Sequence, residues 1–260
     1  MKAGDYRYFD TRFAALAHRG GYLTPADAPR ENTLHAFTQA VDYGYRYLET
    51  DVHTSSDGVL IAFHDDTLNR VSDGAGAPEQ LPWSELRQVL VGGHDPIPTL
   101  DELFEALPTA RFNIDLKVSQ AIEPLAVTIA AHNAYDRVCV GSFSDVRIRA
   151  FRRLAGHRVA TTSGPAGVAG YAYGFGVRRL LHSPGVALQI PQRTWRQRVP
   201  VLTRGLIQAA HRSGRRVHVW TVNEPTEMER LIDLGVDGLV SDRIDLLAQV
   251  LKARDLWEGN

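Results

Sequence analysis

Short apolar runs typical of β-strands alternate with amphipathic runs typical of helices along nearly all of the 260 residues. This alternation favours a parallel sheet in which a covering helix follows each strand. Eight of the apolar runs can form a barrel, and they lie at residues 13–17, 47–53, 111–116, 137–142, 157–161, 186–190, 216–221 and 237–241. Because 260 residues also suit one barrel of this kind, the sequence predicts a (β/α)8 TIM barrel, of the α/β class, as one domain over residues 1–260.

Helical periodicity is expected between most of these strands. The predicted helices lie near residues 31–43, 100–107, 121–132, 144–154, 202–213, 226–234 and 244–253. The segment 162–185 is rich in glycine and tyrosine, so the helix expected there is poorly patterned.

Residues 66–99 break the alternation, because glycine and proline punctuate them and only one short helix, near 83–89, is expected. They follow an extra strand at 59–63, which the hairpin signal Asp57-Gly58 joins to the second barrel strand. Long irregular insertions in compact domains are usually functional. We therefore expect a small insertion after the second strand, placed where it can touch a ligand.

Composition narrows the classes of partner and compartment. The formal net charge of −1 argues against a polyanion such as nucleic acid as the main partner. The single cysteine, Cys139, cannot form an internal disulfide, and neither a signal peptide nor an apolar run of membrane-spanning length is visible. The expectation is a cytoplasmic protein with a small-molecule ligand and no transmembrane segment, whose oligomeric state does not follow from the sequence.

Carboxylates gather at the ends of the first predicted strands. Glu49 and Asp51 are two residues apart, so on a strand they point to the same face, where a bound cation would relieve their repulsion. Asp115 at the end of the third barrel strand can supply another oxygen. Hard oxygen ligands favour Mg²⁺ or Ca²⁺. The alternative is a set of strand-end salt bridges to Arg19 or Lys117.

Two histidines, His18 and His64, end apolar runs on either side of the carboxylate pair in the chain. Cleavage of a phosphodiester needs a base for the attacking oxygen and an acid for the leaving alkoxide, and histidine suits both roles near neutral pH. Arg19 and Lys117 are candidates to grip phosphate oxygens, and an ion pair with Asp115 is the alternative for Lys117. These side chains indicate a metal-dependent phosphodiesterase.

Seven motifs in this order resemble the glycerophosphodiester phosphodiesterase family over nearly the whole chain, roughly from Phe13 to Leu251. They are His18-Arg19-Gly20, Glu31-Asn32-Thr33, Glu49-x-Asp51, His64-Asp65, Asp115-Leu116-Lys117, Trp220-Thr221-Val222-Asn223 and Asp237-Gly238-Leu239-Val240-Ser241-Asp242. The resemblance implies a barrel with a small insertion that hydrolyses glycerophosphodiesters to glycerol 3-phosphate and an alcohol. In the family, the glycerol 2-hydroxyl can attack the phosphorus, and water then opens the cyclic phosphate.

The resemblance also implies roles for particular residues. His18 and His64 match the acid/base pair, although which is the acid stays open. One divalent cation, Mg²⁺ or Ca²⁺, would be held by Glu31, Glu49 and Asp51, together with a position that is commonly Glu and here is Asp115. Taken alone, Glu31 would also pass as an acid near a helix N-terminus.

The substrate side of the site is less specific. Trp220 matches a tryptophan at the mouth, against the alcohol, although an inward tryptophan is more often core. Gln189 and Asn223 lie at or just beyond strand ends and are candidates for hydrogen bonds to substrate hydroxyls.

Two other functions stay open. One is a lysophospholipase D-type enzyme acting on monoacylated lipids, with weak membrane-surface contact. Residues 162–175 would supply its apolar mouth through Val168, Tyr171, Tyr173 and Phe175. The other is a barrel that binds a phosphoryl ligand without turnover, although no histidine or carboxylate of the motifs is lost apart from the change to Asp115.

Overall fold

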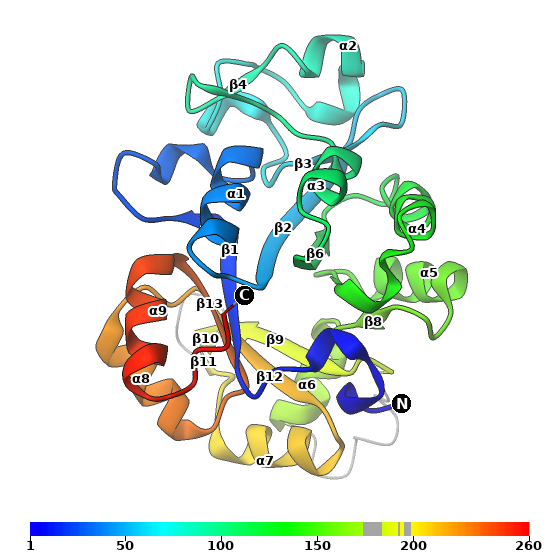
Figure 1. The fold of residues 1–260 in the computed structure, drawn as a ribbon. Coiled ribbons are helices and arrows are strands. Elements are labelled where there is room, and N and C mark those ends of the chain that lie inside the picture. The colour runs from blue at the N-terminus through cyan, green and yellow to red at the C-terminus, as the bar shows by residue number, and fades with distance from the viewer. Residues whose placement is uncertain (174–183, 192, 195–198, 260) are drawn as a thin grey trace.

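The computed structural model describes residues 1–173, 184–191, 193–194 and 199–259. Eight parallel strands form the barrel, in the spatial order β8-β7-β6-β2-β1-β13-β12-β9 (Figure 1). A bridge between Thr162 and Ala187 links the two ends of this order, so the ring is nearly closed. The strands are β1 (Ala14–Tyr22), β2 (Tyr47–Thr54), β6 (Arg111–Leu116), β7 (Val138–Gly141), β8 (Ala160–Thr161), β9 (Ala187–Pro191), β12 (Arg216–Trp220) and β13 (Gly238–Arg243). The predicted (β/α)8 barrel is confirmed.

Helices surround the ring (Figure 1). They are α1 (Leu34–Asp42), α3 (Leu100–Ala106), α4 (Ile122–Ala131), α5 (Asp145–Ala155), α6 (Pro165–Tyr173), α7 (Arg204–Arg212), α8 (Pro225–Leu234) and α9 (Ile244–Ala253). α1 begins three residues later than predicted because the Thr33 hydroxyl caps it by accepting from the Ala36 amide, which leaves Glu31 in the preceding loop. Within the poorly patterned segment, α6 ends at Tyr173, and residues 174–183 lie outside the described residues.

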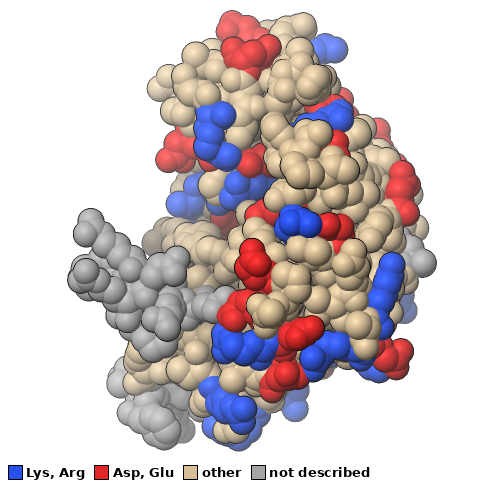
Figure 2. Space-filling view, turned by 90° about the vertical axis from the view of Figure 1, so that its left-hand side faces the viewer, with Lys and Arg blue, Asp and Glu red and all other residues tan. Residues whose placement is uncertain are grey.

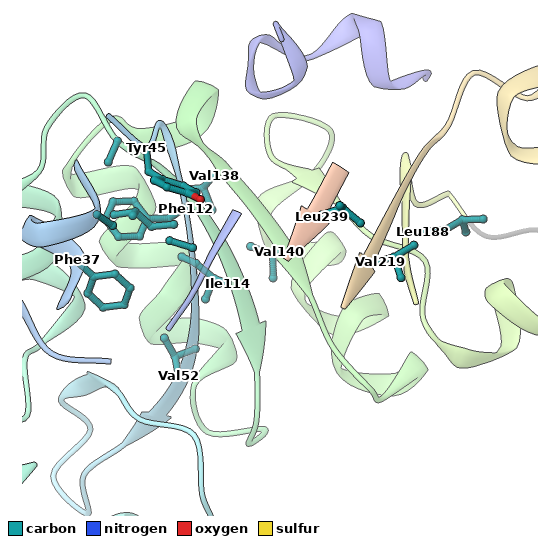
Figure 3. Packing of buried hydrophobic residues seen from close by; sticks show 14 of the residues in the cluster. Phe37, Tyr45, Val52, Phe112, Ile114, Val138, Val140, Leu188, Val219 and Leu239 are labelled. Atoms are coloured by element: carbon teal, nitrogen blue, oxygen red, sulfur yellow. The ribbon is translucent and has the colours of Figure 1, made fainter. Parts of the chain in front are cut away.

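Side chains alternate across each barrel strand and so divide the core into two layers. Outward side chains pack against the helices, and Figure 3 shows part of this layer, in which Phe112 of β6 lies against Phe37 of α1 with ring centroids 6.3 Å apart. Inward side chains include Leu16 and Tyr47, which pack with Tyr8 of an N-terminal 3-10 helix. This segment fills the end of the barrel where the strands begin, and several inward positions near the strands' carboxyl ends are acidic, among them Glu49, Asp51 and Asp115.

The insertion departs from the barrel through β3 (Leu60–Ala62), which pairs antiparallel with β2 as the hairpin signal predicted. It continues through 3-10 helices at Leu68–Arg70 and Pro78–Gln80, then α2 (Trp83–Leu86) and the hairpin of β4 (Leu90–Val91) and β5 (Asp95–Pro96). It has its own small core, in which Phe63, Leu68 and Leu86 are buried. Figure 1 shows this unit at the top, beyond α1 and α3.

Shorter elements complete the chain. Further 3-10 helices span Ala3–Asp5, Arg7–Phe9, Ala28–Arg30 and Ala134–Arg137, and β10 (Arg193–Thr194) pairs antiparallel with β11 (Val199–Pro200). Among the described residues, no helix combines the length and the apolar character needed to cross a membrane. On the face shown in Figure 2, Lys and Arg side chains are interspersed with Asp and Glu.

Candidate active site

A pocket of about 400 Å³ lies at the carboxyl ends of the barrel strands. It brings together most of the residues singled out in the sequence, namely His18, Arg19, Glu49, Asp51, His64, Asp115, Lys117, Gln189 and Trp220. Glu31 lines a smaller pocket beside it, which shares His18 and Arg19. Asn223 does not line either pocket.

His18 on β1 is held by Asp242 near the end of β13. Its Nδ1 lies 2.6 Å from Asp242 Oδ1, and its Nε2 lies 3.8 Å from Glu49 Oε2. Burial lowers the pKa of His18, but the hydrogen bond to Asp242 and the charges of Glu49 and Asp242 outweigh it, so the pKa lies above its ordinary value. His18 therefore presents one nitrogen to the pocket and anchors the other.

His64 follows the extra strand and is paired with its neighbour in the chain. Its Nδ1 lies 2.5 Å from Asp65 Oδ1. Burial lowers the pKa of His64, and the charge of Asp51 and the hydrogen bond with Asp65 only partly oppose this. The hydrogen bond from Arg70 holds the pKa of Asp65 at about 2.

The insertion also contacts the backbone of His64 through the buried side chain of His53. His53 is fully buried on β2, with its Nδ1 hydrogen-bonded to Glu79 of the insertion and its Nε2 3.3 Å from the His64 carbonyl oxygen. This ring thus connects the barrel wall, the insertion and the His64 backbone.

Arg70 of the insertion bridges two acidic side chains of the site. Its guanidinium donates to both oxygens of Asp65 and to both oxygens of Glu31, the latter at 2.7 and 3.1 Å. Arg19 donates to the same Glu31 carboxylate at 3.0 Å. The sequence analysis missed Arg70, and the available signal was weak: it is the only Lys or Arg between Arg46 and Arg87.

Glu49, Asp51 and Asp115 lie side by side on β2 and β6, and two cationic side chains, Arg19 and Lys117, reach them. Asp51 and Asp115 are register partners, and the Lys117 ammonium lies 2.8 Å from Asp51 Oδ1 and 2.9 Å from Asp115 Oδ2. Arg19 Nε lies 3.2 Å from Asp51 Oδ2. The ion-pair alternative for Lys117 is therefore present in the structure, and it leaves Lys117 inside the pocket.

Burial and charge set the ionisation of these acids in different directions. Burial, reinforced by the charge of Asp51, raises the pKa of Glu49 to about 7. Burial alone would raise the pKa of Asp51, but the charges of Lys117 and Arg19 outweigh it and lower that pKa. Burial raises the pKa of Asp115 in spite of the Lys117 charge.

The residues expected to hold a metal are all acidic, and carboxylate oxygens are the ligand type that a hard divalent cation prefers. As the described side chains lie, however, no three His, Cys, Asp or Glu groups converge on one point. Arg19 and Lys117 stand between the carboxylates instead, and Asp115 Oδ2 has no aligned hydrogen-bond donor although Lys117 is close. A cation would have to take the place of these ammonium and guanidinium groups at the carboxylates.

Another part of the pocket lining is apolar. Trp220 packs edge-on against Phe143, with ring centroids 5.6 Å apart, and α6 adds Val168, Ala169 and Ala172. Phe143 is 63% exposed, so it lies at the rim. Gln189 exchanges two side-chain hydrogen bonds with Asn113 across the floor. Trp220 and Gln189 thus both line the pocket, and their contacts with a substrate stay a prediction.

Comparison with known proteins identifies what the chain resembles as a whole. The model of the family described as "Glycerophosphoryl diester phosphodiesterase family" matches residues 18–169 and 176–246. "Probable glycerophosphodiester phosphodiesterase 2" of Mycobacterium tuberculosis is 40% identical over 256 residues, which cover 94% of this chain and 93% of that protein. "Lysophospholipase D GDPD1" of Homo sapiens is 26% identical over 267 residues, which cover 87% and 82%.

Solved structures share the fold. An Oleispira antarctica phosphodiesterase, in complex with the product sn-glycerol-3-phosphate, superposes with a TM-score of 0.76 at 24% identity, covering 92% of this chain and 96% of that one. A glycerophosphodiester phosphodiesterase from Agrobacterium tumefaciens superposes with a TM-score of 0.74 at 24% identity, covering 92% and 99%.

Proposed function

Because the chain belongs to the glycerophosphoryl diester phosphodiesterase family, its activity is that of a phosphoric diester hydrolase, and we propose that the pocket at the carboxyl ends of the strands carries it out. The reaction converts a glycerophosphodiester to glycerol 3-phosphate and an alcohol. One observation supports the site above all others: two carboxylate-anchored histidines, His18 and His64, face one cluster of buried acids and cations. The chain keeps both histidines, so no observation favours a barrel that only binds.

The two histidines perform the proton transfers. Each has its Nδ1 on a carboxylate and therefore offers Nε2 to the pocket. One ring accepts the proton of the attacking hydroxyl, and the other protonates the departing alkoxide. The assignment of acid and base between them stays open.

The residues proposed to hold a single Mg²⁺ or Ca²⁺ are Glu31, Glu49, Asp51 and Asp115. When bound, such a cation would neutralise phosphate charge and lower the pKa of a coordinated hydroxyl. Arg19 and Lys117, which now pair with Asp51, would then be available to the phosphate oxygens. Arg19, Lys117 and Arg70 together offset the charge of the carboxylates at this end of the barrel.

A second candidate substrate is a monoacylated phospholipid, as in a lysophospholipase D. The apolar wall of Phe143, Trp220 and Val168 favours it, and the human relative named lysophospholipase D is consistent with it. Phe143 and Tyr173 are 63% and 59% exposed at the rim, which supports weak contact with a lipid surface. Phe175, also expected at this mouth, lies outside the described residues. Cytoplasmic location stays a prediction from the sequence.

The test is release of glycerol 3-phosphate from a panel of glycerophosphodiesters by purified protein, with EDTA and with added Mg²⁺ or Ca²⁺, beside a lysophospholipid. We expect release that EDTA stops and one of the cations restores. Turnover of the lysophospholipid alone would move the substrate to the second candidate. Release that persists undiminished in EDTA would overturn the metal proposal but leave the reaction class intact.

A further inference from the structure

Asp242 bonds to only one nitrogen of the His18 ring, so the orientation of that ring depends on how the Asp242 carboxylate is held. The carboxylate of Asp242 uses Oδ1 on His18 Nδ1, at 2.6 Å, and Oδ2 on the side-chain amide of Asn223, at 2.8 Å. The two oxygens therefore accept from two different residues on two different strand ends. A rotation of this carboxylate would break both hydrogen bonds at once.

Asn223 has one orientation of its amide that satisfies its neighbours. Its Oδ1 accepts from the Asp242 backbone amide and from the Ser241 hydroxyl, both at 3.0 Å, while its Nδ2 donates to Asp242. A flipped amide would place an NH₂ group against the backbone donor and the carboxylate against a carbonyl oxygen. Both polar atoms of Asn223 are thus engaged on the end of β13.

The segment that carries Asn223 is itself pinned to the barrel. The Val222 amide, which follows the pocket residues Trp220 and Thr221, donates to the Val240 carbonyl oxygen at 3.0 Å. This bond fixes the backbone next to Asn223, and two further hydrogen bonds lead from the Asn223 side chain through Asp242 to His18 on β1. Asn223, expected from the sequence to bond a substrate hydroxyl, lies behind the pocket wall.

We propose that Asn223 and Asp242 form a positioning pair, which holds the His18 ring in the tautomer and orientation that present Nε2 to the substrate. The proposal rests on the proposed function, because it assumes that His18 is a catalytic residue. Asn223 acts through Asp242 and does not contact the substrate. A metal ligand or catalytic histidine is typically tuned in this way by the hydrogen bond at its second nitrogen.

The pair makes a specific prediction for Asp242→Asn. The Asn223 amide needs an acceptor, so the new side chain turns its carbonyl to Asn223 and its NH₂ to His18 Nδ1. His18 Nδ1 must then accept, and the neutral ring carries its proton on Nε2 instead. We expect kcat to fall roughly 10³- to 10⁴-fold with little change in KM, as loss of the correct tautomer does in a serine protease.

The double variant Asn223→Asp with Asp242→Asn exchanges the two groups. The carboxylate introduced at position 223 would accept from the backbone amide, from the Ser241 hydroxyl and from the NH₂ group introduced at position 242. The carbonyl oxygen of the side chain introduced at position 242 would then be free to accept again from His18 Nδ1. We expect the double variant to regain the Nδ1–H tautomer and at least tenfold of the lost kcat. Asn223→Ala, which only loosens Asp242, should lower kcat roughly 10- to 100-fold with KM unchanged.

The measurement combines steady-state kinetics with long-range ¹H–¹⁵N spectra of protein labelled in histidine, recorded at alkaline pH where the ring is neutral. Thr226→Ala, an exposed change three residues along the same segment, is the matched control and should leave the tautomer and kinetics unchanged. A rise in KM in Asn223→Ala, together with an unaltered His18 tautomer in Asp242→Asn, would overturn the positioning role. It would indicate instead that Asn223 binds the substrate. The spectra do not depend on turnover. A tautomer that switches in protein inactive on every phosphodiester would therefore refute the proposed function and support the pair.

Discussion

The raised pKa of Glu49 can be tested through its effect on the free energy of unfolding. The carboxyl group is buried on β2, where burial and the charge of Asp51 raise its pKa from 4.5 to about 7. Glu49→Gln keeps the shape of the side chain and an acceptor for the Arg19 backbone amide, which now donates to Glu49 at 3.3 Å. We expect this variant to be more stable than the wild type in metal-free protein at alkaline pH.

The magnitude follows from linkage between protonation and folding. A carboxyl group whose folded pKa is raised contributes stability that is fully present below its unfolded pKa, 4.5, and is lost as the pH rises through about 7. The two values differ by about 2.5 (7 − 4.5), and one pKa unit is worth about 1.4 kcal/mol. Glu49→Gln should therefore exceed the wild type by about 3 kcal/mol at pH 8.5 and by less than about 1 kcal/mol at pH 5.

The assay is urea unfolding in EDTA at these two pH values. Glu105→Gln, an exposed change on α3, is the control and should differ from the wild type by less than about 0.5 kcal/mol at both. A difference for Glu49→Gln that is the same at both pH values would refute the raised pKa. Adding Mg²⁺ or Ca²⁺ at about 100 times its dissociation constant should stabilise the wild type at pH 8.5 by about 2.7 kcal/mol, and the variant much less if Glu49 is a ligand.

Contacts of three other side chains lead to further expectations. His64→Ala should lower turnover by roughly 10²- to 10⁴-fold, and a near-wild-type rate would contradict its acid/base role. The melting temperature should stay unchanged, because the His64 side chain lies at the rim and is 32% exposed. Arg70→Gln should lower kcat roughly tenfold, because it releases Asp65. Arg70→Lys should be impaired as well, because a lysine cannot donate to both oxygens of Asp65 in a fork, and a fully active lysine variant would contradict this. Tyr45→Phe should cost about 1–2 kcal/mol in urea unfolding, because the buried hydroxyl donates to the Ile244 carbonyl at 2.7 Å; an unchanged midpoint would show that this bond contributes nothing.

The elements of the fold could be read from the sequence with small errors at their ends. Strand β6 was predicted at 111–116 and observed at Arg111–Leu116, where Phe112, Ile114 and Leu116 alternate with polar residues. Strand β8, predicted at 157–161, is only Ala160–Thr161. Its first residues belong to the turn after α5, where Gly156 adopts a positive φ of 64°. Such boundaries depend on local hydrogen bonds that an apolar pattern does not record.

The site could be predicted only where its residues lie on strands or directly follow them. Glu49 and Asp51 share an inward face by the twofold period of a strand, and His18 and His64 follow apolar runs. Arg70 reaches the site from an irregular insertion, and no period predicts where such a side chain points. The hydrogen bonds of Asn223 were also hidden, because its position just beyond a strand suggested a substrate contact and gave no sign that its amide bonds to Ser241 and Asp242 on β13.

The sequence by itself thus determined the (β/α)8 barrel, the family and the side chains at the carboxyl ends of its first strands, because these depend on short-range periods and on motif order. Only the tertiary structure decided which groups meet. It brings Asp242 to His18 across 224 positions of the chain and places Lys117 between Asp51 and Asp115. Closure of the barrel places β13 beside β1. Buried charges are costly unless they are paired, so the charged side chains brought together there form ion pairs and hydrogen bonds. The ionisation of Glu49 and the anchoring of His18 are consequences of that closure, which no local pattern in the chain encodes.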